Sequence, residues 1–158
     1  MLAPMAYAFP IDAAIKALKF RRQLHYGPVF VDLLMTLRAA LPADIDAVLA
    51  VPLHWRRRWL RGFNQAEELA RPVARRLDLP IIGNVHRRRA TAFQSGLSAR
   101  ERAKNLRAAF GVRGRLDFRH VLIVDDVVTS GATLRQLAMV LKRAGVQKVS
   151  GLAVARAG

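Results

Sequence analysis

The sequence predicts an α/β fold in which a parallel sheet lies between layers of helices. Two observations lead to this class. Short apolar runs that are typical of buried strands alternate along the chain with segments whose apolar residues recur at helical spacing. The strand runs are apolar at consecutive positions, which indicates that helices cover both faces of the sheet. A length of 158 residues suits one domain with a substantial core.

The first half of the chain supplies helices and one strand. The first forty residues are expected to be helical, with one apolar face formed by Phe30, Leu33, Leu34, Leu37 and Leu41. Residues 47–51 (AVLAV) are expected to form a buried strand that Pro52 ends. A second amphipathic helix follows, with Asn64 as its N-cap. Pro72 should either kink that helix or mark where it begins.

In the second half, residues 80–82 suggest another brief strand, and residues 83–97 have no period and are expected to form a long loop. The capping box at 98–101 predicts a helix that runs to about Leu106. Residues 120–124 (HVLIV) form the strongest predicted strand. A helix with Leu134, Leu137 and Leu141 on its apolar face follows, closed by Gly145, and residues 148–155 read as a final strand.

Basic residues dominate the charge. Lys and Arg total 27 against 11 Asp and Glu, which gives a formal net charge of +16. Three interpretations stay open: a nucleic-acid partner, a small polyanionic ligand, or a genome composition that favours arginine. The absence of cysteine excludes a disulfide framework, a thiolate zinc site and a cysteine nucleophile. No apolar stretch is long enough for a membrane span and no signal peptide is visible, so a cytoplasmic location is expected.

The segment from Val121 to Thr133 carries the clearest chemical pattern. A buried strand ends in Asp125 and Asp126, and a run of small hydroxyl residues and glycine then leads into a helix. Such a turn offers backbone N–H groups, hydroxyl donors and the positive end of a helix dipole, which together suit a phosphate group. The carboxylates would accept hydrogen bonds from vicinal ribose hydroxyls. Four apolar residues before an Asp also occur in the Walker B strand, but no phosphate-binding P-loop sequence accompanies them.

This segment resembles the phosphoribosyl pyrophosphate signature of type I phosphoribosyltransferases, with Ser130 where a second Thr commonly stands. From about Tyr7 to Arg156 the chain also resembles the ComF family, which groups competence-associated proteins with amidophosphoribosyltransferase-like proteins. The blocks that carry this likeness are VPLHWRRRWLRGFNQ (51–65), QSGLS (94–98) and ERAKN (101–105), of which R-G-F-N-Q is the most distinctive. Family members commonly carry an N-terminal, cysteine-rich, zinc-ribbon-like region, which has no counterpart in this cysteine-free chain.

The resemblance implies a single domain over residues 1–158, with a helical hood segment at 1–42, a core at 43–158 and a flexible hood loop at 87–104. It implies that Asp125 and Asp126 bind the ribose hydroxyls. The 5′-phosphate would be held by Thr129, Ser130, Gly131, Ala132 and Thr133. The pyrophosphate loop would contain Pro52, Leu53, His54 and Arg56, while Arg100 and Lys104 would bring charge when the hood closes. Mg²⁺ would be held mainly through substrate oxygens.

The reaction that the resemblance implies is transfer of a phosphoribosyl group from phosphoribosyl pyrophosphate to a nitrogen acceptor, with release of pyrophosphate. Nothing in the sequence identifies the acceptor. Two other functions stay open: a sensor that binds phosphoribosyl pyrophosphate without turnover, and an accessory protein in DNA uptake that binds single-stranded DNA. A second copy of the chain is a further partner left open. Basic residues confined to the cleft would favour the small ligand, and a basic stripe across the surface would favour DNA.

Overall fold

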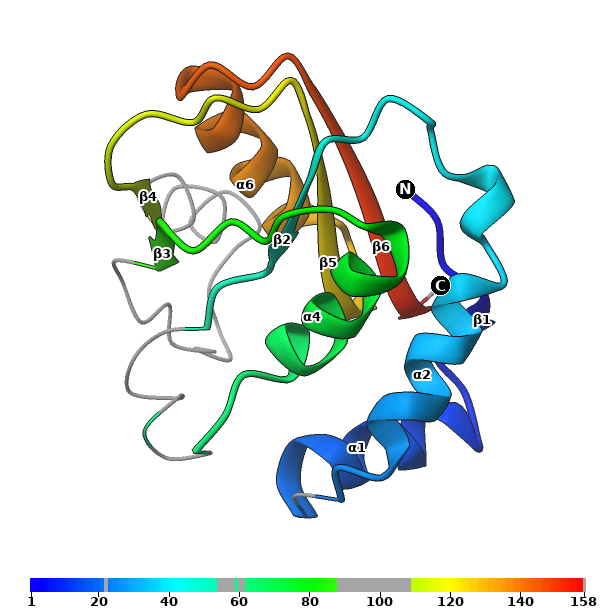
Figure 1. The fold of residues 1–158 in the computed structure, drawn as a ribbon. Coiled ribbons are helices and arrows are strands. Elements are labelled where there is room, and N and C mark those ends of the chain that lie inside the picture. Colours follow the sequence, from blue (N-terminus) through cyan, green and yellow to red (C-terminus); the bar gives the residue numbers. More distant parts are fainter. Residues whose placement is uncertain (22, 54–58, 60–61, 88–108, 158) are drawn as a thin grey trace.

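A parallel sheet of four strands forms the centre of the computed structural model, which describes residues 1–21, 23–53, 59, 62–87 and 109–157 (Figure 1). The strands lie in the order β1-β6-β5-β2, so the sequence order and the spatial order differ. Their bounds are Met5–Ala6 (β1), Ala47–Ala50 (β2), His120–Val128 (β5) and Lys148–Arg156 (β6). The predicted parallel α/β fold is confirmed.

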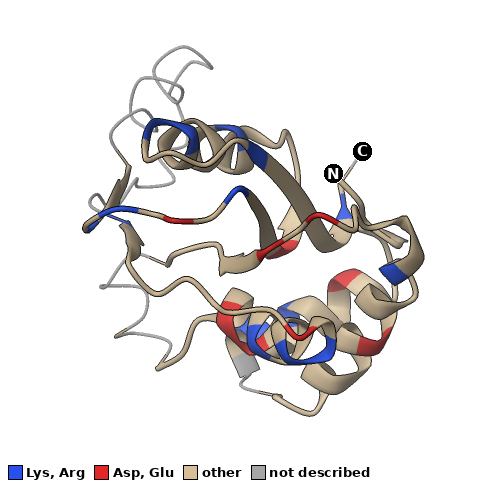
Figure 2. Ribbon diagram, turned by 45° about the horizontal axis from the view of Figure 1, so that its top comes forward, with Lys and Arg blue, Asp and Glu red and all other residues tan. Residues whose placement is uncertain are grey.

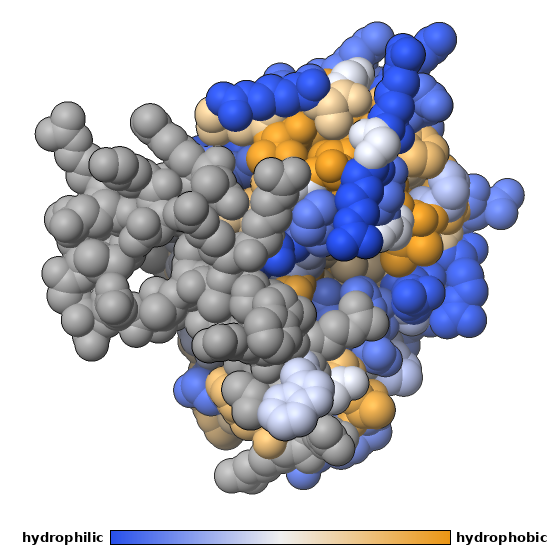
Figure 3. Space-filling view, turned by 90° about the vertical axis from the view of Figure 1, so that its left-hand side faces the viewer, coloured by the Kyte–Doolittle hydropathy of each residue, from blue (hydrophilic) through white to orange (hydrophobic). Residues whose placement is uncertain are grey.

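Helices lie on both sides of this sheet. Figure 2 shows α6 on one side and α1, α2 and α4 on the other. The helices are α1 (Ile11–Arg21), α2 (Tyr26–Met35), α4 (Gln65–Leu77) and α6 (Ala132–Arg143), with a short 3-10 helix, η1 (Arg38–Ala40). Because the central strands are covered on both faces, residues 121–124 of β5 are all buried. On the face seen in Figure 3, most described side chains are hydrophilic, with apolar residues grouped between them.

Helix α4 shows how local sequence sets an element's limits. Asn64 is its N-cap, as expected, because the Asn64 side chain accepts a hydrogen bond of 3.2 Å from the Ala66 N–H. The helix ends at Leu77, and its C-cap Asp78 has a φ of 57°, in the left-handed region. Pro72 lies inside the continuous helix, so it does not mark the beginning. Helix α4 packs against β2 and β5, and Leu69, Ala70 and Val73 are among its buried residues.

Four expectations about the elements need correction. The brief strand expected at 80–82 is only an isolated bridge between Ile81 and Val48 of β2. The expected apolar helical face of residues 30–41 divides, because α2 ends at Met35 and only η1 follows. Residues 5–6 form the edge strand β1 rather than helix, since they pair with the carboxyl end of β6. The expected loop at 83–97 begins with a strand: β3 (Val85–Arg87) pairs antiparallel with β4 (Phe110–Val112). The predicted helix at 98–106 lies outside the described residues.

A polar network holds the amino end of the sheet, opposite the predicted site. Buried His120 lies 2.8 Å from the Asp44 carboxylate through Nδ1 and 2.9 Å from the Ser150 hydroxyl through Nε2. Asp46 accepts hydrogen bonds from the backbone N–H groups of Arg119 (2.7 Å) and His120 (3.0 Å). These bonds tie the segment before β2 to β5 and β6. They fix the register of the strands whose other ends form the site.

Candidate ligand-binding cleft at the carboxyl end of the sheet

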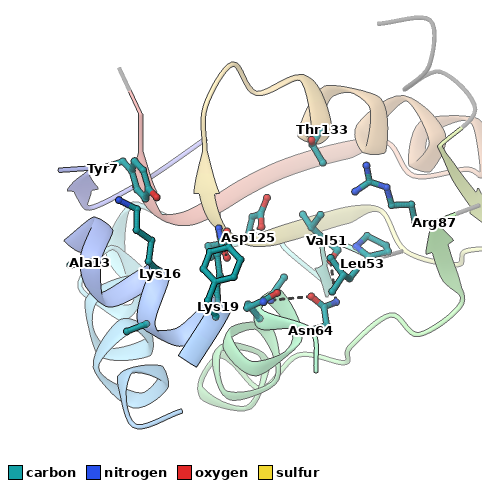
Figure 4. Close-up of a pocket in the computed structure, with 16 residues that line it drawn as sticks. Tyr7, Ala13, Lys16, Lys19, Val51, Leu53, Asn64, Arg87, Asp125 and Thr133 are labelled. Carbon is teal, nitrogen blue, oxygen red and sulfur yellow. Dashed lines mark hydrogen bonds and ion pairs between the residues drawn. The ribbon is translucent and has the colours of Figure 1, made fainter. Parts of the chain in front are cut away.

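A cavity of about 1020 Å³ opens where β2 and β5 end. Its wall is built from the N-terminal segment with α1, the residues after β2, the beginning of α4, the end of β3, the acids of β5 and the beginning of α6. Figure 4 shows Asp125 near the centre, with Lys16 and Lys19 on one side and Arg87 on the other. In open α/β sheets, ligands bind at this carboxyl edge. The cavity therefore lies where the sequence placed the site.

Both predicted acids line the cavity, and strand β5 continues through them to Val128. Asp126 is only 6% exposed, and Asp125 is partly exposed. The Lys19 ammonium of α1 lies 2.9 Å from Asp126 Oδ2. The other oxygen of Asp126 accepts a 2.7 Å hydrogen bond from the Val127 N–H. Asp126 is thus held in place from two sides, by an ion pair and by a backbone hydrogen bond.

The two carboxyl groups have different electrostatic surroundings. Burial, and next the neighbouring charge of Asp126, raise the pKa of Asp125 from 3.8 to about 8, against smaller lowering effects of the Asp126 N–H, Lys19 and Arg87. Asp125 Oδ1 accepts a 2.9 Å hydrogen bond from the Asp126 N–H. Near neutral pH this pair therefore carries one negative charge rather than two, and Lys19 compensates that charge.

The turn before α6 has the geometry expected of an anion site. Gly131 adopts a φ of 69° as the N-cap of α6, and the Ser130 hydroxyl accepts a 3.4 Å hydrogen bond from the Ala132 N–H. A Cβ at this position would lie 3.2 Å from Nη1 of Arg135, so the Arg135 guanidinium reaches over the turn. Thr133 lines the cavity, whereas Thr129 and Ser130 are exposed residues before it and Ala132 is half-buried. The cavity thus meets the N-terminus of α6.

The predicted pyrophosphate loop is described in part. Pro52 and Leu53 line the cavity directly after β2. His54 and Arg56, predicted in the same loop, lie outside the described residues, as do Arg100 and Lys104 of the predicted hood. The structure therefore brings these predicted residues together in one cavity: Pro52, Leu53, Asp125, Asp126 and Thr133.

Several cavity residues have no assigned role in the sequence-based prediction. Tyr7, Lys16 and Lys19 come from the N-terminal segment, and Gln65 comes from the beginning of α4. Arg87, the first residue of the predicted hood loop, lies instead at the end of β3 and also lines the cavity. One signal was available for Gln65, because it belongs to the distinctive R-G-F-N-Q block. For the lysines the signal was weaker: they stand three residues apart on a predicted helix, in a chain whose basic residues are mostly arginine.

Comparisons with known proteins agree with this geometry. Residues 64–157 match the phosphoribosyl transferase domain family. Competence protein F of Haemophilus influenzae is 34% identical, over 96% of this chain and 70% of its own length. The DNA utilization protein YhgH of Escherichia coli K12 is 40% identical, over 90% of this chain and 66% of its own length. The chain belongs to the ComF family. It spans about two thirds of the length of these ComF relatives.

A solved structure supports the fold of this ComF protein. The orotate phosphoribosyltransferase from Aeropyrum pernix superposes with a TM-score of 0.53 and 20% identity, covering 87% of this chain and 76% of the other. The type I phosphoribosyltransferase fold is therefore confirmed. Within the described ranges, no helix is long and apolar enough to cross a membrane.

Proposed function

We propose that this ComF protein binds phosphoribosyl pyrophosphate together with Mg²⁺ and transfers the phosphoribosyl group to a nitrogen acceptor. The observation that carries the proposal is the composition of the cavity. It combines a carboxyl pair, a helix N-terminus and positively charged side chains from other elements. This combination suits a ligand whose hydroxyl groups lie between two phosphate-bearing ends.

Each part of the ligand has a complementary group. The 5′-phosphate would lie on the turn at Gly131 and Thr133, where the α6 N-terminus and the Arg135 guanidinium favour negative charge. The ribose hydroxyls would bond to Asp125 and Asp126. The pyrophosphate would lie beside the residues that follow β2, within reach of the positive charge of Arg87.

The proposed reaction breaks the bond between ribose C1 and the pyrophosphate oxygen and forms a bond between C1 and the acceptor nitrogen. Pyrophosphate leaves with the bonding electron pair, and the acceptor nitrogen loses a proton. The chain's residues hold the sugar in place and neutralise the departing charge, while the enclosing wall limits the access of water.

The described residues also bear on Mg²⁺. They contain no group of three or more His, Cys, Asp or Glu that could bind a metal ion, and the Asp126 oxygens already contact Lys19 and a backbone N–H. Mg²⁺ would be held mainly through ligand oxygens, where it would neutralise pyrophosphate charge.

A thermal-shift titration tests binding. Phosphoribosyl pyrophosphate with Mg²⁺ at 100 times its Kd adds about 2.7 kcal/mol, or roughly 5–10 °C in Tm for a chain of this size. Ribose 5-phosphate, pyrophosphate and single-stranded DNA at about 150 mM salt are the controls. Asp125→Asn should reduce the shift, and pyrophosphate release with a panel of nitrogen acceptors then tests turnover. No shift, or a shift that pyrophosphate alone reproduces, contradicts the proposal.

A second candidate function is binding of single-stranded DNA. It is favoured by the names of the relatives, which refer to competence and DNA utilization, and by the net charge of +16. The described basic residues occur on helices of both layers (Figure 2), so they are not confined to the cleft. Fluorescence anisotropy with an oligonucleotide at about 50 and 200 mM salt tests this candidate. DNA binding that phosphoribosyl pyrophosphate does not displace would place the two ligands on different surfaces.

A further inference from the structure

Two adjacent buried amides at the beginning of α4 have different surroundings. Asn64 is 4% exposed, and both of its polar atoms are used: Nδ2 donates to the Val51 carbonyl (3.2 Å) and Oδ1 accepts from the Ala66 N–H (3.2 Å). Gln65 is 3% exposed, yet its Nε2 has no hydrogen-bond partner among the described residues. Asn64 therefore has a structural role, because both of its hydrogen bonds are to the backbone. The side-chain donor of Gln65 has no partner among the described residues.

An unused buried donor is costly, because the amide loses its bonds to water and gains none in return. Native proteins satisfy nearly all such groups, and the exceptions often belong to functional sites. Gln65 lines the cavity described above, so a bound ligand could supply the missing acceptor. Since the amide nitrogen only donates, the ligand atom must be an acceptor such as oxygen.

The position of Gln65 indicates which part of the ligand it meets. The bond from Asn64 to the Val51 carbonyl fixes the beginning of α4 beside Pro52 and Leu53, which follow β2 and line the same cavity. The N-terminus of a helix of 13 residues carries a partial positive charge. The first-turn acids Glu67 and Glu68 do not belong to this cavity wall. An anionic oxygen is therefore favoured at this position.

We propose that the Gln65 side-chain amide donates a hydrogen bond to a pyrophosphate oxygen of phosphoribosyl pyrophosphate, which makes Gln65 a determinant of affinity for the pyrophosphate end. This inference rests on the proposed function. The pyrophosphate would then be contacted from two places in the chain: by the residues directly after β2 and by Gln65 at the beginning of α4.

The test compares the wild type with Gln65→Met, which keeps a long unbranched side chain but has no donor. Melting temperatures are measured without ligand and with each of three probes: phosphoribosyl pyrophosphate–Mg²⁺, pyrophosphate–Mg²⁺ and ribose 5-phosphate. We expect the ligand-free Tm of Gln65→Met to equal or exceed that of the wild type, because an unsatisfied donor is removed. The Kd for the two pyrophosphate-bearing probes should rise about tenfold or more, with ribose 5-phosphate unaffected.

Two further variants make the result interpretable. Asn64→Ala is the matched control, and it should lower the ligand-free Tm because Asn64 has structural partners. Gln65→Glu keeps the shape of the side chain and adds a negative charge, so it should weaken pyrophosphate binding more than Gln65→Met does.

Different failures have different meanings. If the wild type binds phosphoribosyl pyrophosphate but both Gln65 variants bind it equally well, this inference is wrong and the proposed function stands. A lower ligand-free Tm for Gln65→Met also overturns it, because the amide would then have a structural role. Weaker binding of ribose 5-phosphate alone would place Gln65 at the wrong end of the ligand. If the wild type binds none of the probes, the proposed function fails together with this inference.

Discussion

The ligand-free protein should lose stability as the pH rises from about 5 to 8, and Asp125→Asn should abolish that part of the pH dependence. The pKa of Asp125 is raised to about 8 in the folded chain, against 3.8 for an unperturbed carboxyl group. Between these values the folded state holds a proton that the unfolded state has released. Raising the pH therefore favours unfolding, and the stabilisation is lost as the pH passes through the folded pKa.

The size of the effect has an upper limit. One proton changes the free energy of unfolding by at most about 1.4 kcal/mol per pH unit. For a chain of this size that corresponds to about 3–6 °C in Tm per pH unit. The observed slope should be smaller, because Asp125 is partly exposed and solvent screens the interaction.

Thermal melts of both proteins at pH 5, 6, 7 and 8 provide the assay. The difference between their Tm values cancels the contributions of all groups that both proteins share. The stability of the Asn variant relative to the wild type should increase steadily from pH 5 to pH 8. Melting curves that stay parallel across this range would refute the assignment of a raised pKa to Asp125.

The remaining predictions concern single contacts. Lys19→Met should destabilise the fold by about 3 kcal/mol, because it leaves the buried Asp126 carboxylate without its cation, and the double variant Lys19→Met/Asp126→Asn should recover most of this loss in chemical denaturation. Gly131→Ala should cost about 1–2 kcal/mol, since its φ of 69° disfavours a side chain, and calorimetry should show weaker ribose 5-phosphate binding. Asn64→Ala should lower stability by about 2–4 kcal/mol, because a helix cap and a buried backbone carbonyl both lose their partner, and urea denaturation measures the loss. Hydrogen bonds from Lys148 and His120 lower the pKa of Asp44 from 3.8 to about 2. The Asp44 carboxylate therefore stabilises the fold above pH 4, and its contribution disappears as the pH falls towards 2. An acid titration followed by circular dichroism should therefore show a shallower decline for Asp44→Asn, and an unchanged decline would contradict this reasoning.

The sequence predicts best those parts of the site that are contiguous in the chain. Strand β5, its two acids, the glycine turn and α6 follow one another within residues 120–143, so one pattern of hydropathy and small residues indicates them all. The Asn64 cap is predictable for the same reason, since its partner Ala66 is two residues away. For these elements and for the Asn64 cap, interactions between residues close in the sequence are sufficient to predict the structure.

The features that the sequence does not predict depend on long-range contacts. Lys19 reaches Asp126 across more than one hundred positions of the chain, and nothing near Lys19 indicates this partner. Strand β3 is too short to show a period and forms only because residues 110–112 pair with it. The unused donor of Gln65 becomes visible only when the neighbours of each atom are known.

The contact between Lys19 and Asp126 resolves an electrostatic difficulty of the site. Two ionised carboxylates would repel a ligand that carries several negative charges. In this structure burial keeps a proton on Asp125 near neutral pH, and the Lys19 ammonium at 2.9 Å compensates Asp126. The acid pair can then accept hydrogen bonds from hydroxyl groups without presenting net negative charge to the phosphates. Helix α1 thus has an electrostatic role in addition to lining the cleft. Its Lys19 compensates the charge of Asp126, so the acid pair is compatible with the proposed polyanionic ligand.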